Sequence, residues 1–532
     1  MTVIYLTDDC IYHILNYLQN NRSTLFNCLL VNRFWSKVTI PLLYANPFSR
    51  LKDVNKSLII NTFLLCLNEE ERNYLIKRNN IQKKLNSKLF QRNEIKLIYE
   101  YPKYIKKLSK FSIYNSIDHW YRQQIKITFN NNDNIINNNT LNDNMPLFIK
   151  ATFYHMFLRK SNYIRDLEIS LNLLKQDIFD INSIIINDIK ISNLIILRLN
   201  SCYYKTHEIF YEFLKTILKN CKNLKRLDLM DIDLYYNSNE ISSIIKQQNE
   251  LKEFNFYGFY KLSSNDIFSS LEYQKNSLIS LKFHDINFQH CILQNVIKLH
   301  NLKSLEIIYC YGMTLELCQI FEFASFKLKE LSIKNIWGSN ITSKIIKYLG
   351  KYLQRLKIEN INVEIMNSII QYSLELKTLD IYSGCHINLS ILPYLKNLKI
   401  KNLNIYLNAF IIESFFTKLA ENLSNTMTKI SFVTAINEIS LLKFLNGCYY
   451  NNQIINLNSL NFNQKFELKH LEIILNYIKN KNFNLKYLGI CGLDKIWNIK
   501  ELILLNQIKE KGIKLVEFRD NFKECDYQLS DY

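Results

Sequence analysis

Histidine, cysteine and acidic residues are the side chains of this sequence that could bind a metal ion or perform catalysis, and their spacing matches neither use. His207-Glu208 begins like the zinc-binding pattern H-E-x-x-H, but Tyr211 occupies the position of the second ligand. The 12 cysteines include no C-x-x-C pair, which excludes a zinc ribbon and a thioredoxin-type motif on spacing. Three further histidines fall on repeating strand and helix positions, where ordinary surface or core roles are expected: His284, His290 and His300. No metal and no cofactor are predicted.

Glycine-rich loops and nucleophile motifs are also missing from the sequence. It contains no G-x-S-x-G, no G-x-x-x-x-G-K-[ST] and no G-x-G-x-x-G. With only 9 Gly and 5 Pro among 532 residues, little material remains for phosphate-binding loops or tight hairpins. These features argue against an enzyme, a nucleotide-binding fold and an all-β sandwich, so the chain is expected to act through binding.

Length and composition indicate an intracellular protein with several domains or a repeat array. A chain of 532 residues is too long for one compact core. The first residues carry Asp8 and Asp9 where a signal peptide needs positive charge. No apolar run approaches the roughly 18–20 residues of a membrane span, and the scattered cysteines suit a reducing compartment. We therefore expect the cytoplasm or the nucleus, with no membrane partner.

The formal net charge of +19 suggests a nucleic acid at first sight, but it has a simpler origin. The sequence is rich in Asn, Ile, Lys, Tyr and Phe, whose codons are rich in A and T. Lysine in place of arginine and neutral asparagine in place of aspartate raise the charge without selection for an anionic partner. Charge alone informs on solubility and non-specific binding, so it does not identify a ligand.

An internal repeat determines the expected architecture. The pattern L-x-x-L-x-[L/I/F] recurs at intervals of 19 to 32 residues, with starts at Leu194, Leu224, Leu251, Leu278, Leu302, Leu328, Leu353, Leu376, Leu395, Leu457 and Leu485 and looser copies at Ile164 and Met427. Residues two apart on a strand face the same side, so each copy predicts a short strand with two buried side chains. Strands are expected to centre on Leu197–Leu199, Leu227–Leu229, Leu305–Ile307, Leu331–Ile333 and Leu379–Ile381.

Helical stretches separate these strands. Residues 206–220 carry Phe210, Phe213, Leu214 and Ile217 at the spacing of one helix face. A strand and a helix per unit, stacked so that neighbours bury each other's apolar faces, is the leucine-rich-repeat solenoid, or horseshoe. The expected fold class is α/β, with the solenoid over residues 151–532. Residues 49–150 are expected to be a helical connecting region with an Asn-rich loop at 130–144.

Residues 1–48 follow a different pattern, that of a small all-α module of three helices. Ile11, Ile14, Leu15 and Leu18 have the spacing of one helix face, Asn20 to Ser23 interrupt the helix, and Asn32 can cap a third one. Such a cluster is too small to bury its own apolar surface, so part of it should face a partner. A plain helical cap on the solenoid is the alternative.

The sequence of this module resembles the F-box motif. The matching segments are Leu6-Thr-Asp-Asp-Cys-Ile-Tyr-His-Ile-Leu-Asn-Tyr-Leu18 and Cys28-Leu-Leu-Val-Asn-Arg-Phe-Trp35, with Thr7 where the family usually has Pro. Joined to a repeat array, the pattern is similar to large fungal F-box/leucine-rich-repeat families. The resemblance implies a non-catalytic subunit that docks the Skp-type adaptor of an SCF-type cullin–RING ubiquitin ligase. The residues implied in docking are Leu6, Ile11, Ile14, Leu18, Leu29, Val31 and Trp35.

The concave face of the solenoid is the expected surface for a substrate protein, which would be ubiquitinated and degraded by the proteasome. Positions four and six residues after each repeat start should project from it, and they are mixed in charge with aromatic entries. That mixture suits a protein better than nucleic acid, which would require concentrated Lys and Arg. The predicted contact residues are Tyr257, His284, Ile308, Tyr382 and Lys399. A repeat scaffold with no ligase role is the alternative function, and a nucleic-acid-binding solenoid comes third.

Overall fold

The computed structural model describes the 532-residue chain except for residues 1–6, 20, 50–52, 83–89, 91–96, 131–146, 175, 177, 179–190, 201–206, 233, 259–264, 292, 335–336, 384–387, 408–412, 451–456, 480–484, 495 and 519–532. The chain forms two compact units, Met1–Ser277 (unit 1) and Leu278–Tyr532 (unit 2). Most of the Asn-rich segment at 130–144 lies outside the described residues.

Unit 1 begins with a module of three short helices, each started by a polar side chain. They are α1 (Asp8–Tyr17), α2 (Arg22–Leu29) and α3 (Arg33–Leu43). Thr7, Asn21 and Asn32 precede them, and each side-chain oxygen accepts a hydrogen bond from a backbone N–H in the first turn. The small core of the module consists of Ile11, Leu15, Leu25, Cys28 and Leu43. The predicted helix cap at Asn32 is thus confirmed.

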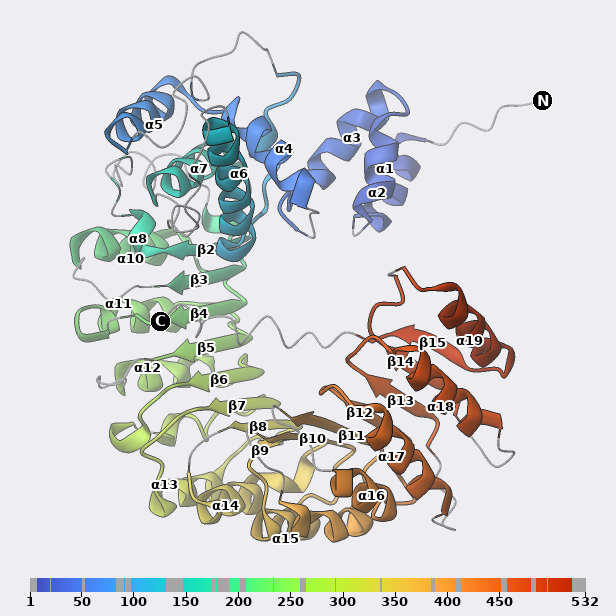
Figure 1. Ribbon diagram of the computed structural model, residues 1–532. Helices are drawn as coiled ribbons and strands as arrows, with labels where there is room; N and C mark the ends of the chain where they lie inside the picture. The colour runs from blue at the N-terminus through green and yellow to red at the C-terminus, as the bar shows by residue number, and fades with distance from the viewer. Residues whose placement is uncertain are drawn as a thin grey trace. The chain divides into compact units, whose positions relative to one another are not determined.

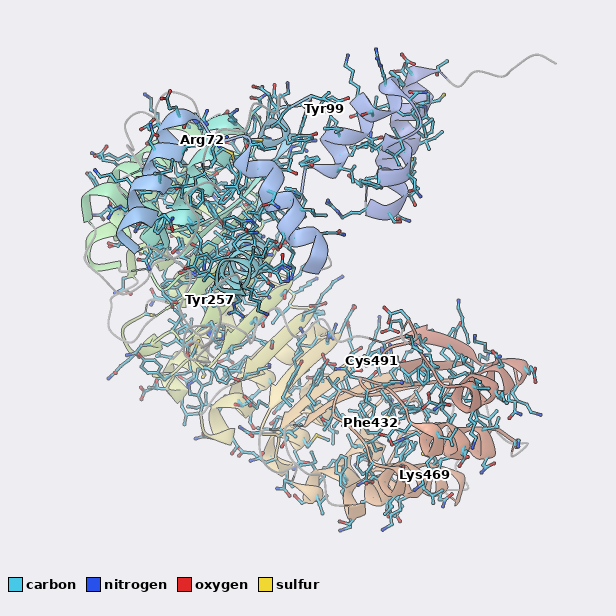
Figure 2. The ribbon with its side chains drawn as sticks, turned by 45° about the horizontal axis from the view of Figure 1, so that its top comes forward. Arg72, Tyr99, Tyr257, Phe432, Lys469 and Cys491 are labelled. Atoms are coloured by element: carbon cyan, nitrogen blue, oxygen red, sulfur yellow. The ribbon has the colours of Figure 1, made fainter. Side chains whose placement is uncertain are left out.

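A helical region and a parallel sheet complete unit 1. The helices of the region are α4 (Asp53–Leu64), α5 (Glu69–Gln82), η2 (Tyr101–Tyr104), α6 (Lys110–Asn130) and α7 (Leu147–Lys160). Arg72 on α5 (Figure 2) donates to the backbone carbonyls of Leu64 and Leu67 and so holds the end of α4. Phe48, Phe63 and Phe157 pack in a buried aromatic cluster with ring centroids 4.9–5.8 Å apart.

The sheet of unit 1 contains β1 (Lys107–Leu108), β2 (Asp166–Ser170), β3 (Ile196–Asn200), β4 (Arg226–Met230) and β5 (Glu253–Tyr257). These strands follow chain order, and each pairs in parallel with the next. Between or after these strands lie α8 (Leu171–Leu174), η4 (Ile191–Asn193), α10 (His207–Asn220), α11 (Leu234–Lys246), α12 (Asn265–Ser270) and η5 (Leu271–Gln274). The apolar pairs of successive strands are in register, as Leu197 and Leu199 are with Leu227 and Leu229.

Unit 2 repeats the same arrangement. Its parallel strands, again in chain order, are β6 (Ser280–His284), β7 (Ser304–Ile308), β8 (Glu330–Lys334), β9 (Arg355–Glu359), β10 (Thr378–Ser383), β11 (Asn402–Leu407), β12 (Lys429–Phe432), β13 (Ser459–Phe462), β14 (Tyr487–Ile490) and β15 (Lys514–Glu517). The helices alternate with the strands and cover one face of the sheet (Figure 1). They are η6 (Phe288–His290), η7 (Leu293–Asn295), α13 (Leu315–Gln319), η8 (Ile320–Phe323), α14 (Ser339–Leu349), η9 (Gly350–Tyr352), α15 (Val363–Tyr372), η10 (Leu389–Asn397), α16 (Glu413–Glu421), α17 (Glu438–Tyr450), α18 (Leu468–Lys479) and α19 (Ile499–Glu510).

The predicted fold class is confirmed: both units have the architecture of an α/β leucine-rich-repeat solenoid. Each of the five predicted leucine and isoleucine pairs lies in a strand with both side chains buried. The parallel sheet begins at β1, and α7 lies between β1 and β2.

One repeat start was wrong. The pattern beginning at Leu395 places a strand at Leu398 and Ile400, but η10 ends at Asn397 and β11 begins at Asn402. In the structure, Leu403 and Ile405 pair with Leu379 and Ile381 of β10, so the repeat begins at Ile400. The displacement of five residues matters for the site, because it changes which side chains project from β11.

A buried carboxylate stabilises the helical region of unit 1. Glu71 on α5 is fully buried, its Oε1 lies 2.7 Å from His155 Nδ1, and Arg159 donates to both of its oxygens. Burial alone would raise the pKa of Glu71, but the hydrogen bonds from His155, Arg159 and the Asn68 N–H outweigh it and hold the pKa below its usual value.

A depressed carboxyl pKa predicts acid lability of this region. The stability that Glu71 contributes is present above the usual carboxyl pKa and is lost as the pH falls through the lower pKa of the folded state. We expect Glu71→Gln to lower the free energy of unfolding by about 2 kcal/mol at neutral pH, with the difference from the natural chain shrinking below about pH 4. Urea unfolding at several pH values, followed by tryptophan fluorescence, checks this. A difference that is constant with pH would contradict the role of the carboxylate.

At Gly489 in β14, the packing of unit 2 requires a residue without a side chain. A Cβ atom at this position would lie 2.2 Å from Asn461 Oδ1 on the neighbouring strand and 3.1 Å from Phe518 Cβ. The Asn461 side chain is buried and donates to Ser431 Oγ at 3.1 Å, so it cannot move away freely. Gly489→Ala should therefore cost about 1 kcal/mol or more of unfolding free energy, and Asn461→Ala should relieve most of the added cost. A double-mutant cycle in urea that shows additive effects would contradict this packing.

Candidate binding surfaces

The N-terminal module exposes more apolar side chains than a module of its size would be expected to leave in water. Two of them, Ile14 and Tyr17, are one turn apart on α1, and Leu30 and Val31 occupy the turn between α2 and α3. Tyr12 and Phe26 are exposed as well. Leu30 and Val31 keep 69% and 59% of their surface accessible. The core of the module consists of Ile11, Leu15, Leu25 and their neighbours, so these exposed residues form an apolar surface outside it.

The predicted docking residues differ in their exposure in the structure. Ile14 and Val31 are exposed, whereas Ile11 belongs to the core of the module. Three others pack against that core and are half-buried: Leu18, Leu29 and Trp35. Leu6 lies outside the described residues. The exposed residues that the sequence reasoning missed are Tyr12, Tyr17, Phe26 and Leu30, although their positions off the buried helix stripe could have indicated them.

The module is joined to the rest of unit 1 by specific contacts around the end of α3. The Tyr44 ring lies 4.5 Å from that of Tyr101, and Ser36 Oγ is 3.1 Å from Tyr99 Oη (Figure 2). The Ala45 carbonyl accepts hydrogen bonds from the backbone N–H groups of Lys106 and Lys107, directly before and at the start of β1. Removing residues 1–48 would therefore expose an edge of the sheet, and point substitutions are the cleaner test of the module.

The sheet face opposite the helices, here called the strand face, carries an ion-pair ladder in unit 1. Lys107 Nζ lies 3.2 Å from Asp166, and Arg198 bridges Asp166 and Asp228. Arg226 binds Asp228 at 2.9 Å. Asn255 Nδ2 donates to the same carboxylate at 2.6 Å, and Arg226 also reaches Glu253 at 3.3 Å. Burial opposes the charge of Arg226, but the hydrogen bond that Arg226 donates to Asp228 and the negative charges of Asp228 and Glu253 together outweigh it and raise the pKa of the guanidinium. These charges largely neutralise each other.

The strand face of unit 2 combines paired charges with aromatic rings. Lys282 pairs with Glu306 at 2.8 Å, and Arg355 pairs with the buried Asp380 at 2.8 Å. Tyr382 stacks on Tyr406 with 4.1 Å between ring centroids, and the ammonium of Lys334 lies 4.0 Å from the Tyr382 ring centroid. Towards β14 the face has Ser431, Asn461 and Gly489 in successive strands, with Lys429 on the same side of β12 as Ser431. Phe432, the next residue of β12 after Ser431, is buried (Figure 2).

Three of the five predicted substrate-contact residues lie on the strand face of unit 2 as expected. His284 and Ile308 are paired neighbours on β6 and β7 and are half-buried, and Tyr382 on β10 is only 7% exposed. Tyr257 lies at the end of β5 in unit 1 (Figure 2). The placement of Lys399 on the strand face was wrong, because Lys399 is an exposed residue in the segment before β11. Asn404 and Tyr406 occupy the corresponding strand positions.

His284 belongs to a small polar cluster at the end of β6. Its Nδ1 lies 2.7 Å from Asp285 Oδ2, and its ring meets the ring of Tyr309 edge-on at 5.5 Å between centroids. Asp285 and Tyr309 both have positive φ angles, 55° and 51°, and each donates its backbone N–H to the carbonyl that ends the next strand. This conformation is costly for a bulky side chain such as that of Tyr309, so the strand pairing must enforce it.

Neither metal ligation nor membrane insertion is indicated where the chain is described. In those residues, no three His, Cys, Asp or Glu side chains come together as metal ligands. None of the described helices combines the length and the hydrophobicity that crossing a bilayer requires.

Comparison with known proteins identifies no family for this chain. No family model and no curated protein sequence matches the chain. Solved structures of leucine-rich-repeat proteins are similar to it at low identity. The repeat-containing protein LegL7 from Legionella pneumophila is 13% identical, with a TM-score of 0.31, over 57% of this chain and 85% of its own.

Two complexes give similar values. A chain of the yeast Rad7–Elc1 complex is 14% identical with a TM-score of 0.29, covering 70% of this chain and 83% of that chain. A chain of the TLR13–ssRNA13 complex is 15% identical with a TM-score of 0.31, and the match spans 61% of this chain but only 46% of that one. The fold assignment thus depends on the repeat register and strand pairing of the chain itself.

Proposed function

We propose that this chain is a substrate-recognition adaptor of an SCF-type cullin–RING ubiquitin ligase. The three-helix module docks the Skp-type adaptor, and the repeats bind the substrate protein that is then ubiquitinated and degraded. The chain has a binding role only, and the transfer of ubiquitin belongs to partner subunits. Its own contribution is to hold the substrate within reach of them.

The observation that carries the proposal is the exposed apolar surface of a module whose sequence resembles the F-box. Burying an exposed leucine or valine side chain contributes about 1.5–3 kcal/mol in the absence of opposing costs. A contact that covers Leu30, Val31 and Ile14 therefore has enough apolar surface for stable docking. The caps at Thr7, Asn21 and Asn32 fix the three helices independently of a partner, so the surface is preformed.

The repeats supply a surface suited to a protein substrate. On the strand face of unit 2, paired charges lie beside the half-buried His284 and Ile308 and the Tyr382–Tyr406 stack. Aromatic and aliphatic side chains among satisfied polar groups are characteristic of protein interfaces. We propose His284, Ile308 and Tyr382 of unit 2 and Tyr257 of unit 1 as contact residues.

Co-expression of the intact chain with a Skp-type adaptor tests this function. We expect the two proteins to elute together in size-exclusion chromatography at micromolar concentration. An adaptor that elutes alone, while the chain remains folded by circular dichroism, would leave a repeat scaffold with no ligase role. That scaffold is the alternative function.

A further inference from the structure

Lysines are concentrated on one edge of the sheet in unit 2. The six residues before each of the strands β7 to β11 contain nine lysines and one glutamate in total, and the six residues after the same strands contain no lysine and two glutamates. All nine lysines are exposed: Lys298, Lys303, Lys327, Lys329, Lys351, Lys377, Lys396, Lys399 and Lys401. The N-terminal edge of these strands is therefore strongly basic.

Four of the lysines lie at equivalent positions before neighbouring strands and are called here the lysine row: Lys303, Lys329, Lys377 and Lys401, with Gln354 at the middle position. Backbone hydrogen bonds of 2.8–2.9 Å connect successive positions, from Lys329 to Lys303, from Gln354 to Lys329, from Lys377 to Gln354 and from Lys401 to Lys377. Neighbouring strands are about 4.8 Å apart, so the row extends over roughly 19 Å.

No carboxylate neutralises the lysine row within the described part of the chain. Lys225, which occupies the equivalent position before β4 in unit 1, pairs with Glu250 at 2.6 Å. The four lysines of the row have no such ion pair among the described residues. The four ammonium groups therefore lack the direct ion pair that Lys225 has.

Two ordinary explanations of the row fail. A bias towards lysine codons would place lysines after the strands as often as before them, yet none follows β7–β11 within six residues. The helix dipole favours lysine only within the last helical turn. Lys329, Lys377 and Lys401 lie four to six residues beyond Phe323, Tyr372 and Asn397, where the preceding helices end.

We propose that the lysine row binds an extended, acidic segment of the substrate protein, rich in Asp and Glu. This inference rests on the proposed function, in which the repeats hold a protein. An extended segment of about six residues matches the length of the row, and alternate side chains would face it. The negative charge of such a segment complements a row whose four lysines form no ion pair with a described carboxylate.

Nucleic acid fits the row less well. Single-stranded nucleic acid is bound by aromatic rings on which bases stack, and arginine is the preferred group for forked contacts to phosphate. The same stretches contain no arginine. Phe326 is buried, Tyr372 is half-buried, and the Tyr352 ring is flanked by the ammonium groups of Lys327 and Lys351 at 5.2 and 5.4 Å from its centroid.

Fluorescence anisotropy with the full-length protein tests the proposal. The probes are a labelled twelve-residue peptide of alternating Glu and Ser, the same peptide with Gln for Glu, and a twelve-nucleotide single-stranded RNA. The row variant carries Lys303→Gln, Lys329→Gln, Lys377→Gln and Lys401→Gln. The control variant loses the same charge at exposed lysines elsewhere in unit 2: Lys469→Gln on α18 (Figure 2), Lys500→Gln, Lys509→Gln and Lys511→Gln.

We expect the natural chain to bind the Glu peptide in a salt-dependent way and the Gln peptide at least about tenfold more weakly. The row variant should lose about tenfold or more in affinity for the Glu peptide, and the control variant less than about twofold. Equal losses in the two variants, no binding of the Glu peptide, or tighter row-dependent binding of the RNA would each overturn the proposal. Co-elution with the Skp-type adaptor, measured on the same variants, is independent of the row. If the chain binds the adaptor but not the peptide, only the proposal for the lysine row is overturned. If it binds the peptide but not the adaptor, only the proposed role as a ligase subunit is overturned.

Discussion

Replacing Leu30 and Val31 together with aspartate should reduce the affinity for the Skp-type adaptor by at least about a hundredfold. Both side chains are exposed in the free protein, so the substitution removes little of the module's own packing. In the complex they would be covered, and two carboxylates would then be buried without partners, which costs more than the lost apolar contact. Isothermal titration of the purified variant with the adaptor measures the change.

The control for this variant makes the same chemical change far from the module in sequence. Leu374 and Ile439 in unit 2 are 79% and 54% exposed, and Leu374→Asp with Ile439→Asp should leave adaptor affinity within about twofold. Circular dichroism should show that both variants are folded. Equal affinity of the adaptor for the natural chain and for the Leu30/Val31 variant would remove these residues from the interface.

The second large effect concerns stability. Asp228 is fully buried on the strand face of unit 1, forms an ion pair with Arg198 and accepts hydrogen bonds from Arg226 and Asn255. Asp228→Ala leaves two guanidinium groups side by side without this shared carboxylate. Breaking a buried pair from one side typically costs about 3–5 kcal/mol. We expect a loss of about 4 kcal/mol in the unfolding free energy of unit 1, measured by urea denaturation.

A partly exposed pair provides the comparison. Lys282 and Glu306 in unit 2 keep 34% and 19% of their side-chain surface accessible, so Lys282→Gln should cost less than about 1 kcal/mol. Adding Arg226→Met to Asp228→Ala should recover part of the stability, because one of the two orphaned charges disappears. A cost below about 1 kcal/mol for Asp228→Ala alone would show that the ladder is not held by this carboxylate.

Most of the fold could be predicted from the sequence because the repeat pattern states directly which side chains a strand buries. Leu227 and Leu229 are typical: their spacing of two, repeated in each unit, is compatible with a strand and with little else. The pattern predicted the wrong strand at one place, where two different starting residues both give the repeat spacing. Leu395, Leu398 and Ile400 match L-x-x-L-x-I as well as Ile400, Leu403 and Ile405 do. Only pairing with β10, a contact between segments distant in sequence, selects the second frame.

The candidate sites were predicted less completely, for a related reason. A helical pattern shows that Ile11, Ile14 and Leu18 are apolar, but it does not show which of them the module uses for its own core. Ile11 faces Leu15 and Leu25 inside the module, whereas Ile14 remains exposed. Likewise, the sequence pattern placed Lys399 and Lys401 on the strand face only because the repeat start at Leu395 is five residues too early. In the structure both residues precede β11, and Lys401 belongs to the lysine row.

One measurement tests both parts of the central claim, that the module recruits the ligase and that the repeats hold the substrate. The tagged natural chain and its Leu30→Asp/Val31→Asp variant are affinity-purified from cells with the proteasome inhibited, and the co-purified proteins are quantified by mass spectrometry. We predict that the natural chain recovers the Skp-type adaptor, the cullin and ubiquitinated substrate. The variant should recover the same substrate without ubiquitin and without the ligase subunits. Absence of adaptor and cullin from the natural chain, or equal recovery with the variant, would contradict the account.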